Sequence, residues 1–355
     1  MKKLLVRFLK YLTKNEEQEA IFQPEPQQGR EPEETKLIVE TKQDIQEISK
    51  EPEEKIISKI QLEETENKLS KKTKKKVSTD LTTLLFDPRD MMEIMEYPYL
   101  SLSKNRTAPI YYERETSNGI VKIRVSCHPP HYVASIYDWD IIMFVESKIQ
   151  ETMNSGSDIP PRTLIVPRHE LLKSLHKHDG NKQNKDLHAS LTRLKTTVIE
   201  TSVRNEDRKY DCFGWLDSWG YTERKDIKEI KITLSQWLYD GICQKGALLK
   251  VRPEYFDITS GLKKFLYRTA RKHVGNQNDS WIMSLETLYE KSAVERDLRK
   301  FKYDLKKVVS ENDIPGYLLE WIEEYGKTSI RFINARKEIK RMLSEASTQP
   351  SLPFL

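Results

Sequence analysis

Long hydrophobic runs are missing from this sequence. The 355-residue chain has a mean hydropathy of -0.70, and no segment approaches the roughly 20 apolar residues that a membrane-spanning helix needs. The N-terminal segment MKKLLVRFLKYLTKN contains hydrophobic residues, but Arg7 and Lys10 interrupt them, so it lacks the continuous apolar core of a signal peptide. We therefore expect a soluble, cytoplasmic protein.

Cysteine is also scarce. Cys127, Cys212 and Cys243 are odd in number and far apart, which favours reduced, buried thiols over a disulfide framework. Cys127 is followed by His128 and His131 in CHPPH, but the two prolines extend this segment and no fourth ligand follows at zinc spacing. The sequence therefore predicts no metal site and no cofactor.

Catalytic motifs are largely absent as well. No GxxxxGK[ST] loop is present to hold nucleotide phosphates. A nicking enzyme of the rolling-circle type would carry two histidines around a bulky hydrophobe, plus a nucleophilic tyrosine. His176 and His178 have this spacing but flank Lys177, and Tyr303 precedes Lys307 by one helical turn. Helical spacing accounts for the latter pair more simply, and the metal half of the site is missing. We predict a protein that is not an enzyme, with nicking activity as the alternative.

Charge and composition divide the chain. The 60 basic and 55 acidic residues give a net charge of +5, so local clustering must decide whether a polyanion is the partner. Residues 2–14 can form a short basic amphipathic helix that touches a membrane surface or a partner, although a fraying terminus is the simpler interpretation. Residues 15–87 are rich in Glu, Lys, Gln and Ser, which predicts a disordered tail over 1–87.

After residue 88 the pattern predicts a first folded unit over 88–233. The alternation at 120–126 is typical of a strand, and Asp138 resembles the N-cap of a helix that ends near Glu151. A strand at 163–166, a helix after Pro167, the turn HDGNKQN, a helix carrying Leu187, Leu191 and Leu194, and a strand at 196–203 follow. This order of elements is that of a winged helix.

A similar order recurs over 234–335. Ser235 can cap a helix, and a strand at 248–251 and a helix at 261–274 come next. A strand at 281–285, helices at 286–292 and 294–309, and a strand at 329–333 complete the unit. The fold class we predict is α+β, with two tandem winged-helix domains between the disordered N-terminal tail and a C-terminal tail over 336–355.

The helix predicted at 294–309 carries the strongest functional signal. Its apolar residues recur at the spacing that buries one face. Its outward residues are mostly cations, in an array about as wide as a DNA groove: Arg296, Arg299, Lys300, Lys302, Tyr303, Lys306 and Lys307. We predict that this helix is the principal reader of double-stranded DNA.

Further DNA contacts are predicted at four places. The helix after the turn in the first unit offers a sparser set, namely His188, Ser190, Arg193 and Lys195. The expected wing tips offer Arg204, Arg208, Lys209, Lys327 and Arg331. Late in the 261–274 helix, Arg268, Arg271 and Lys272 can contact phosphates, although cations at this end also stabilise any helix. For all these helices a solvated charged face is the alternative interpretation.

Several strings resemble a known family, the replication initiator protein A family of bacterial plasmids. They occur in the same order between residues 88 and 335: DMMEIMEYPYLSLSKNR at 90–106, SIYDWDIIMF at 135–144, RTLIVPRHELL at 162–172, LTRLKTTVIETSVR at 191–204, FGWLDSW at 213–219, LSQWLYDGI at 234–242 and DITSGLKKFLYRTARKHVG at 257–275. The N-terminal 87 residues lie outside the resemblance.

The resemblance implies an initiator that binds repeated sites at a plasmid origin, helps to open the duplex and recruits the host initiator and replicative helicase. It also implies autorepression as a dimer, with dimerisation through the N-terminal winged helix. A winged-helix transcriptional repressor remains the alternative from the same structural class. The DNA-facing residues named above come from helical spacing and not from the family.

Overall fold

The computed structural model describes residues 86–117, 119–156, 159–204, 210–224, 227–275 and 279–348. The predicted tail over 1–87 and the basic helix at 2–14 lie, apart from residues 86 and 87, outside this part of the chain. Residues 79–335 belong to one compact unit, which is followed by α13 (Ala335–Thr348). None of the described helices is both long and apolar enough to cross a membrane.

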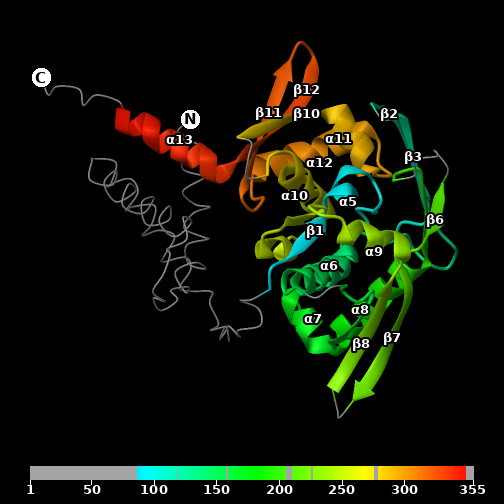
Figure 1. Ribbon diagram of the computed structural model, residues 1–355. Coiled ribbons are helices and arrows are strands. Elements are labelled where there is room, and N and C mark those ends of the chain that lie inside the picture. Colours follow the sequence, from blue (N-terminus) through cyan, green and yellow to red (C-terminus); the bar gives the residue numbers. More distant parts are fainter. Residues whose placement is uncertain are drawn as a thin grey trace, which may run out of the picture. The chain divides into compact units, whose positions relative to one another are not determined.

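The first half of the compact unit contains a helix-rich series that ends in a hairpin. Its elements are α6 (Trp139–Asn154), β4 (Thr163–Pro167), α7 (Arg168–Ser174), α8 (Asn181–Thr196), β7 (Leu216–Arg224) and β8 (Ile227–Leu234). The three strands form an antiparallel sheet in the order β4-β8-β7. The α8 helix packs beside β7 (Figure 1).

The second half repeats this series. Its elements are α10 (Gly261–His273), β10 (Ser280–Ser284), α11 (Leu285–Ser292), α12 (Leu298–Glu311), β11 (Tyr317–Glu324) and β12 (Lys327–Asn334). The sheet order is β10-β12-β11, so the strand between the helices again pairs with the last strand. In Figure 1 the β7–β8 and β11–β12 hairpins project from opposite ends of the unit.

The compact unit also contains elements that belong to neither series. A four-stranded sheet has the order β2-β3-β5-β6, built from β2 (Ile110–Thr116), β3 (Gly119–Cys127), β5 (Thr197–Thr201) and β6 (Asp211–Phe213). A small sheet pairs β1 (Arg89–Met91) with β9 (Leu248–Lys250). The helix α5 (Met92–Glu96), the helix α9 (Gln236–Cys243) and a 3-10 turn at Pro253–Asp257 complete the unit.

Buried ion pairs hold α10 against β1 and α6. The Arg268 guanidinium donates to both carboxylate oxygens of Asp90, at 2.6 and 3.2 Å, and the Lys264 ammonium donates to both oxygens of Asp140, at 2.8 and 2.9 Å. All four side chains are buried. Removing one partner of such a pair leaves an uncompensated charge in the core, so these contacts fix how α10 lies against the first half.

The structure confirms the mixed helix and strand composition and most of the predicted elements. Several helices and strands, however, begin or end at other residues than predicted. The third predicted helix begins at Asn181, within the expected turn, and the strand after it pairs with β3 instead of joining β4. The hairpin beside α8 is therefore β7–β8, whose strands end and begin at Arg224 and Ile227. No residue range was predicted for the strands β1, β2, β6, β7, β8 and β11.

Candidate nucleic-acid interface

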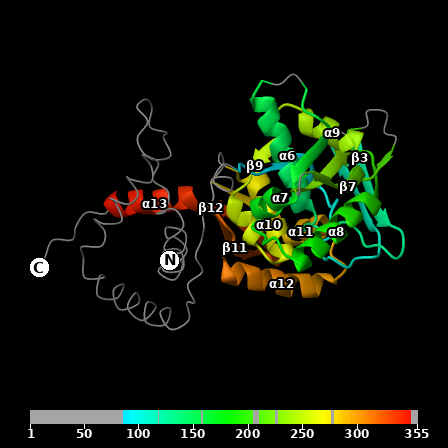
Figure 2. The same cartoon turned by 90° about the horizontal axis from the view of Figure 1, so that it is seen from below.

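The α12 helix presents one apolar face to the protein and one basic face to solvent. Phe301, Leu305 and Val308 are buried, at the spacing of three to four residues that places side chains on one side of a helix. Their burial holds the helix rigidly against α11 and β11. Figure 2 shows α12 at the periphery of the compact unit, and residues of its other face are exposed.

The helix begins later than its sequence pattern suggests. Asp297 is the N-cap and its carboxylate accepts a hydrogen bond of 2.9 Å from the Lys300 amide, which satisfies a backbone donor that would otherwise be free. Arg296 therefore precedes α12 and pairs with Asp304 at 2.8 Å. The prediction that Arg296 is an outward residue of this helix was wrong, because the helix begins only after the Asp297 cap.

Four cations and a tyrosine form the accessible face of α12, which we call the basic face: Arg299, Lys300, Tyr303, Lys306 and Lys307. Tyr303 is 74% exposed. The ion pairs of Lys300 with Asp297 at 3.2 Å and of Lys307 with Glu311 at 4.0 Å are local and exposed. Pairs of this kind are weak in water, so both ammonium groups are available to an anionic partner.

The β11–β12 hairpin extends the basic face. Trp321 of β11 lies beneath the ammonium groups of Lys302 and Lys306, each 5.6 Å from the centre of a ring, and Lys302 donates to the Thr328 hydroxyl at 3.0 Å. Lys302 is thus turned toward the hairpin and is less accessible than predicted. Lys327 is exposed at the hairpin turn.

Four predicted contacts in the second half have structural partners. Arg268 is buried against Asp90, Lys272 is half-buried in an ion pair with Glu96, and the Arg271 guanidinium donates to the Lys250 carbonyl at 2.5 Å. Arg331 pairs across the hairpin with Glu320 at 2.9 Å. Arg268 is a correction to the prediction, because a buried cation cannot reach a phosphate, whereas the predicted roles of Arg271, Lys272 and Arg331 stay predictions.

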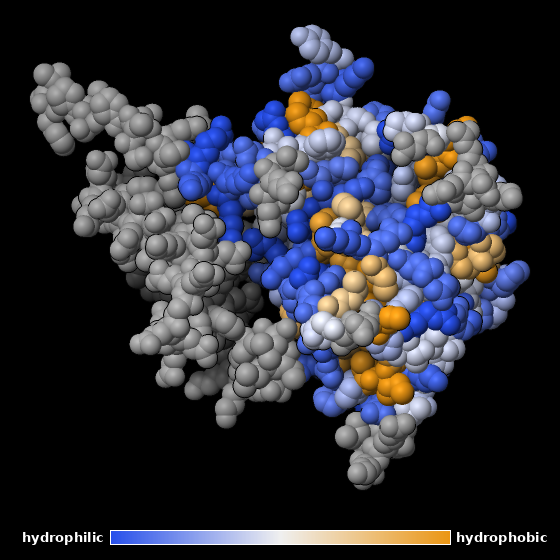
Figure 3. All heavy atoms as spheres, in the orientation of Figure 1, coloured by the Kyte–Doolittle hydropathy of each residue, from blue (hydrophilic) through white to orange (hydrophobic). Residues whose placement is uncertain are grey.

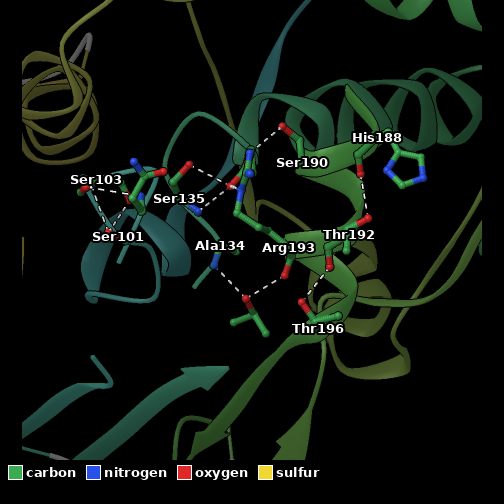
Figure 4. Close-up of polar contacts among 12 residues, drawn as sticks. Ser101, Ser103, Ala134, Ser135, His188, Ser190, Thr192, Arg193 and Thr196 are labelled. Atoms are coloured by element: carbon green, nitrogen blue, oxygen red, sulfur yellow. Dashed lines mark hydrogen bonds and ion pairs between the residues drawn. The ribbon is translucent and has the colours of Figure 1, made fainter. Parts of the chain in front are cut away.

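In the first half, the residues predicted to contact DNA from α8 have different surroundings. The Arg193 guanidinium donates to both oxygens of the fully buried Asp138, at 2.9 and 2.7 Å, and to the Ser190 hydroxyl at 3.2 Å. Arg193 therefore holds α8 to the start of α6, and both residues are less available to DNA than predicted. Figure 4 shows the His188 ring directed away from this network. Lys195 is exposed and donates to the Asp217 carbonyl at 2.5 Å.

The expected wing tip of the first half also needs correction. Arg204 has a left-handed backbone, with φ of 66°, and its guanidinium lies 3.4 Å from the centre of a ring of Trp237 and pairs with Glu93 at 3.0 Å. It is packed against α9 and α5 instead of projecting to solvent. Arg208 and Lys209 lie outside the described residues, and their predicted role stays a prediction.

Sequence reasoning missed a cleft between α8 and the β7–β8 hairpin. It is lined by Arg168, Asn184, Lys185, His188, Tyr221, Thr222 and Lys228 and encloses about 610 Å³. Of these residues only His188 was predicted to have a function. The one available signal was that Lys185 lies one helical turn before His188, on the same side of the helix.

A family model described as replication initiator protein A matches residues 89–319. The chain belongs to this family. It is also 31% identical over 239 residues to a protein of Wigglesworthia glossinidia brevipalpis whose provisional name is replication protein, an alignment that covers 66% of this chain and 84% of the relative. The family predicted from the sequence strings is thereby confirmed.

Among solved structures, the chain is similar to a crystal structure of domains 2 and 3 of RctB. The TM-score is 0.50 at 15% sequence identity, and the similarity covers 69% of this chain and 98% of the solved one. At this level of identity the likeness concerns the fold alone. It supports a mixed α and β architecture for this member of the initiator family.

The candidate catalytic and metal-binding residues of this initiator lie in ordinary surroundings. His176 pairs with Asp257 at 2.9 Å, and the Cys127 thiol lies 3.2 Å from the His131 carbonyl. No three His, Cys, Asp or Glu side chains of the described residues are grouped as metal ligands. The three cysteines are free, but Cys212 is exposed and Cys127 and Cys243 are only partly buried, which corrects the prediction of buried thiols.

Proposed function

We propose that this initiator binds repeated sites in the double-stranded origin of a plasmid through two winged-helix units. The two series of elements support this assignment, because each places a helix, a strand, two helices and a hairpin in the order typical of a winged helix. In that motif the second helix of the pair enters the major groove and the hairpin contacts the backbone. The corresponding helices here are α8 and α12.

The observation that carries the proposal is the basic face of α12. Its cations sit on a helix whose opposite side is anchored by Phe301, Leu305 and Val308, so their positions relative to one another are fixed. Arginine and lysine side chains contact phosphates and the acceptor edge of guanine. Since Arg193 and Lys195, the cations predicted to contact DNA from α8, are engaged within the protein, α12 is the stronger DNA-binding helix.

The family supports the remaining steps of the proposed function. After binding, the protein assists opening of the duplex and recruits the host initiator and the replicative helicase, without chemistry of its own. It represses its own promoter as a homodimer that forms through the first winged-helix unit. Bacterial cytoplasm is the compartment in which these partners occur.

A footprint on the parent plasmid tests the proposal. Protection of several direct repeats in the origin is expected, because one α12 reads one repeat. Protection of an inverted repeat at a promoter alone, with no change in permanganate reactivity of the adjacent DNA, would instead favour the second candidate, a winged-helix repressor.

The nicking alternative is tested separately. Supercoiled plasmid incubated with the protein and Mg²⁺ should stay intact and carry no covalent adduct, because Tyr303 is exposed on a helix without a metal site beside it among the described residues. An adduct that disappears in the Tyr303→Phe variant would overturn the assignment as a binding protein.

A further inference from the structure

We propose that the cleft between α8 and the β7–β8 hairpin is a binding site for single-stranded DNA. This role goes beyond the duplex binding proposed above and does not use the basic face of α12. The cleft is open to solvent and measures about 610 Å³, a volume that accommodates a nucleotide.

Cations surround the opening of the cleft. Lys185 comes from α8, Lys228 from β8 and Arg168 from the start of α7. The two lysines are exposed, and no ion pair of either occurs among the described residues. Arg168 pairs with Asp179 at 3.1 Å, which leaves the cleft with an excess of positive charge. Three cations from three different elements converge on a space that suits a phosphate group.

Two buried polar atoms in the cleft also lack partners. The Arg168 Nε and the Asn184 Oδ1 make no hydrogen bond with the described part of the chain. Buried polar groups are normally satisfied, and a ligand or a water satisfies many of those that the protein itself leaves without a partner. A nucleotide offers both kinds of partner, because phosphate oxygens accept hydrogen bonds and the edge of a base donates them.

Tyr221 and His188 contribute aromatic rings to the wall of the cleft, and Trp219 lies beside them. Trp219 and Tyr221 lie on the face of β7 that packs on α8, and the His188 ring lies 4.9 Å from Trp219 and 6.4 Å from Tyr221 between ring centres. Tyr221 is 46% exposed. Bases stack on such rings in proteins that bind single strands. Duplex DNA cannot use this wall, because its base faces are already stacked on one another.

The register of the hairpin brings these groups together. Tyr221 pairs with Ile230 and Trp219 with Ile232 across the β7–β8 ladder. Side chains alternate between faces along a strand, so Lys228 shares the face of the two isoleucines. That face is turned toward α8. The sequence therefore places a cation and two aromatic rings together on the surface that meets Lys185 and His188.

Fluorescence anisotropy with a labelled oligothymidylate of about 20 nucleotides tests this site in the full chain. The Lys185→Ala/Lys228→Ala variant and the Tyr221→Ala variant should each raise the dissociation constant about tenfold or more, which is the effect of losing one stacked base or its phosphate contacts. Tyr221→Phe should bind like the wild type because it keeps the ring. Lys245→Ala is the matched control, since Lys245 is an exposed lysine that does not line the cleft.

Two further measurements distinguish the cleft from the basic face of α12 and from a site for free nucleotides. The Lys300→Glu/Lys307→Glu variant of α12 should retain single-strand affinity within about twofold. The cleft variants should lose much less affinity for an origin duplex than for the single strand, because α12 is the stronger duplex-binding helix. Equal loss of duplex and single-strand affinity in the cleft variants, or wild-type single-strand affinity in all of them, would overturn the proposal. Thymidine monophosphate that binds as tightly as the oligomer would also overturn it, in favour of a free nucleotide. Thermal melting checks that each variant is folded.

Discussion

At the scale of single residues, the accessibility of a cation decides what it does. Arg193 and Lys300 are both basic residues on the outer side of a predicted helix, yet the Arg193 guanidinium is bound to the buried Asp138 while the Lys300 ammonium is exposed. The sequence spacing is similar in the two cases. The difference arises from Asp138, a partner 55 residues away in the chain, which no local pattern reveals.

The contact between Arg193 and Asp138 yields a first prediction. The Arg193→Ala substitution should lower the free energy of unfolding by about 3 kcal/mol, because it leaves a buried carboxylate without its charged partner. Urea denaturation measures this change. Lys195→Ala, two residues later and exposed, should change stability by less than about 0.5 kcal/mol. If both variants unfold at the wild-type urea concentration, the Arg193–Asp138 pair does not stabilise the fold.

Glu146 of α6 gives a second prediction, on pH. Burial raises the pKa of this carboxyl well above its ordinary value, and the negative charge of Asp90 raises it further, against the opposing effect of Arg268. A raised folded-state pKa means that stability is fully present at low pH and is lost as the pH rises through that value. Glu146→Gln should therefore be more stable than the wild type at pH 8, with a smaller difference at pH 5, in urea denaturation. An equal difference at both values would contradict the buried, protonated state.

At the scale of elements, the sequence predicted α12 better than its neighbours. The apolar period was long and regular, and only its start was misplaced, because Asp297 caps the helix four residues before Phe301. The first hairpin was predicted at the wrong place. Residues 197–201 do form a strand, as their propensity indicates, but this strand pairs with β3 and is not part of the hairpin beside α8. Strand partners depend on long-range packing, so propensity identifies a strand without identifying its sheet.

The basic face of α12 gives a third prediction, on salt dependence. Each lysine that neutralises a phosphate releases counterions, so Lys307→Ala should lower the slope of log affinity against log salt concentration by about 1. Binding to an origin duplex is measured at several salt concentrations for this purpose. Lys245→Ala serves as the control and should leave the slope unchanged. An unchanged slope in Lys307→Ala would show that Lys307 contacts no phosphate.

The surface around these elements is predominantly hydrophilic. Figure 3 shows hydrophilic residues over most of the face in view, with apolar patches that are separated from one another. The exposed large hydrophobic residues are likewise scattered among several elements. Scattered apolar residues are normal on protein surfaces, so charge is the stronger guide to the partner of this molecule.

At the scale of the whole molecule, the contacts between the two halves could not be predicted from the sequence. Arg268 was predicted to contact phosphates and Lys264 was given no role. In the structure, Arg268 pairs with Asp90 of β1 and Lys264 pairs with Asp140 of α6. These pairs span 178 and 124 residues. Helical periodicity reports which face of α10 is buried, but not what lies opposite.

These buried pairs give a fourth prediction. Residues 79–335 should unfold in one cooperative transition, because separating the halves would leave Asp90 and Asp140 buried without their cations. Calorimetry on the full chain, with circular dichroism as a second probe, measures this directly. Two resolved transitions would show instead that the two winged-helix units are independent domains.

The most direct test of the central claim is the affinity of the Lys300→Glu/Lys307→Glu variant for a duplex from the origin of the parent plasmid. Both lysines are exposed and their ion pairs are local, so the variant should fold and melt like the wild type. If the basic face of α12 binds DNA, specific binding should fall by at least about a hundredfold, since two attractive contacts become repulsive. Wild-type affinity in a folded variant would contradict the claim.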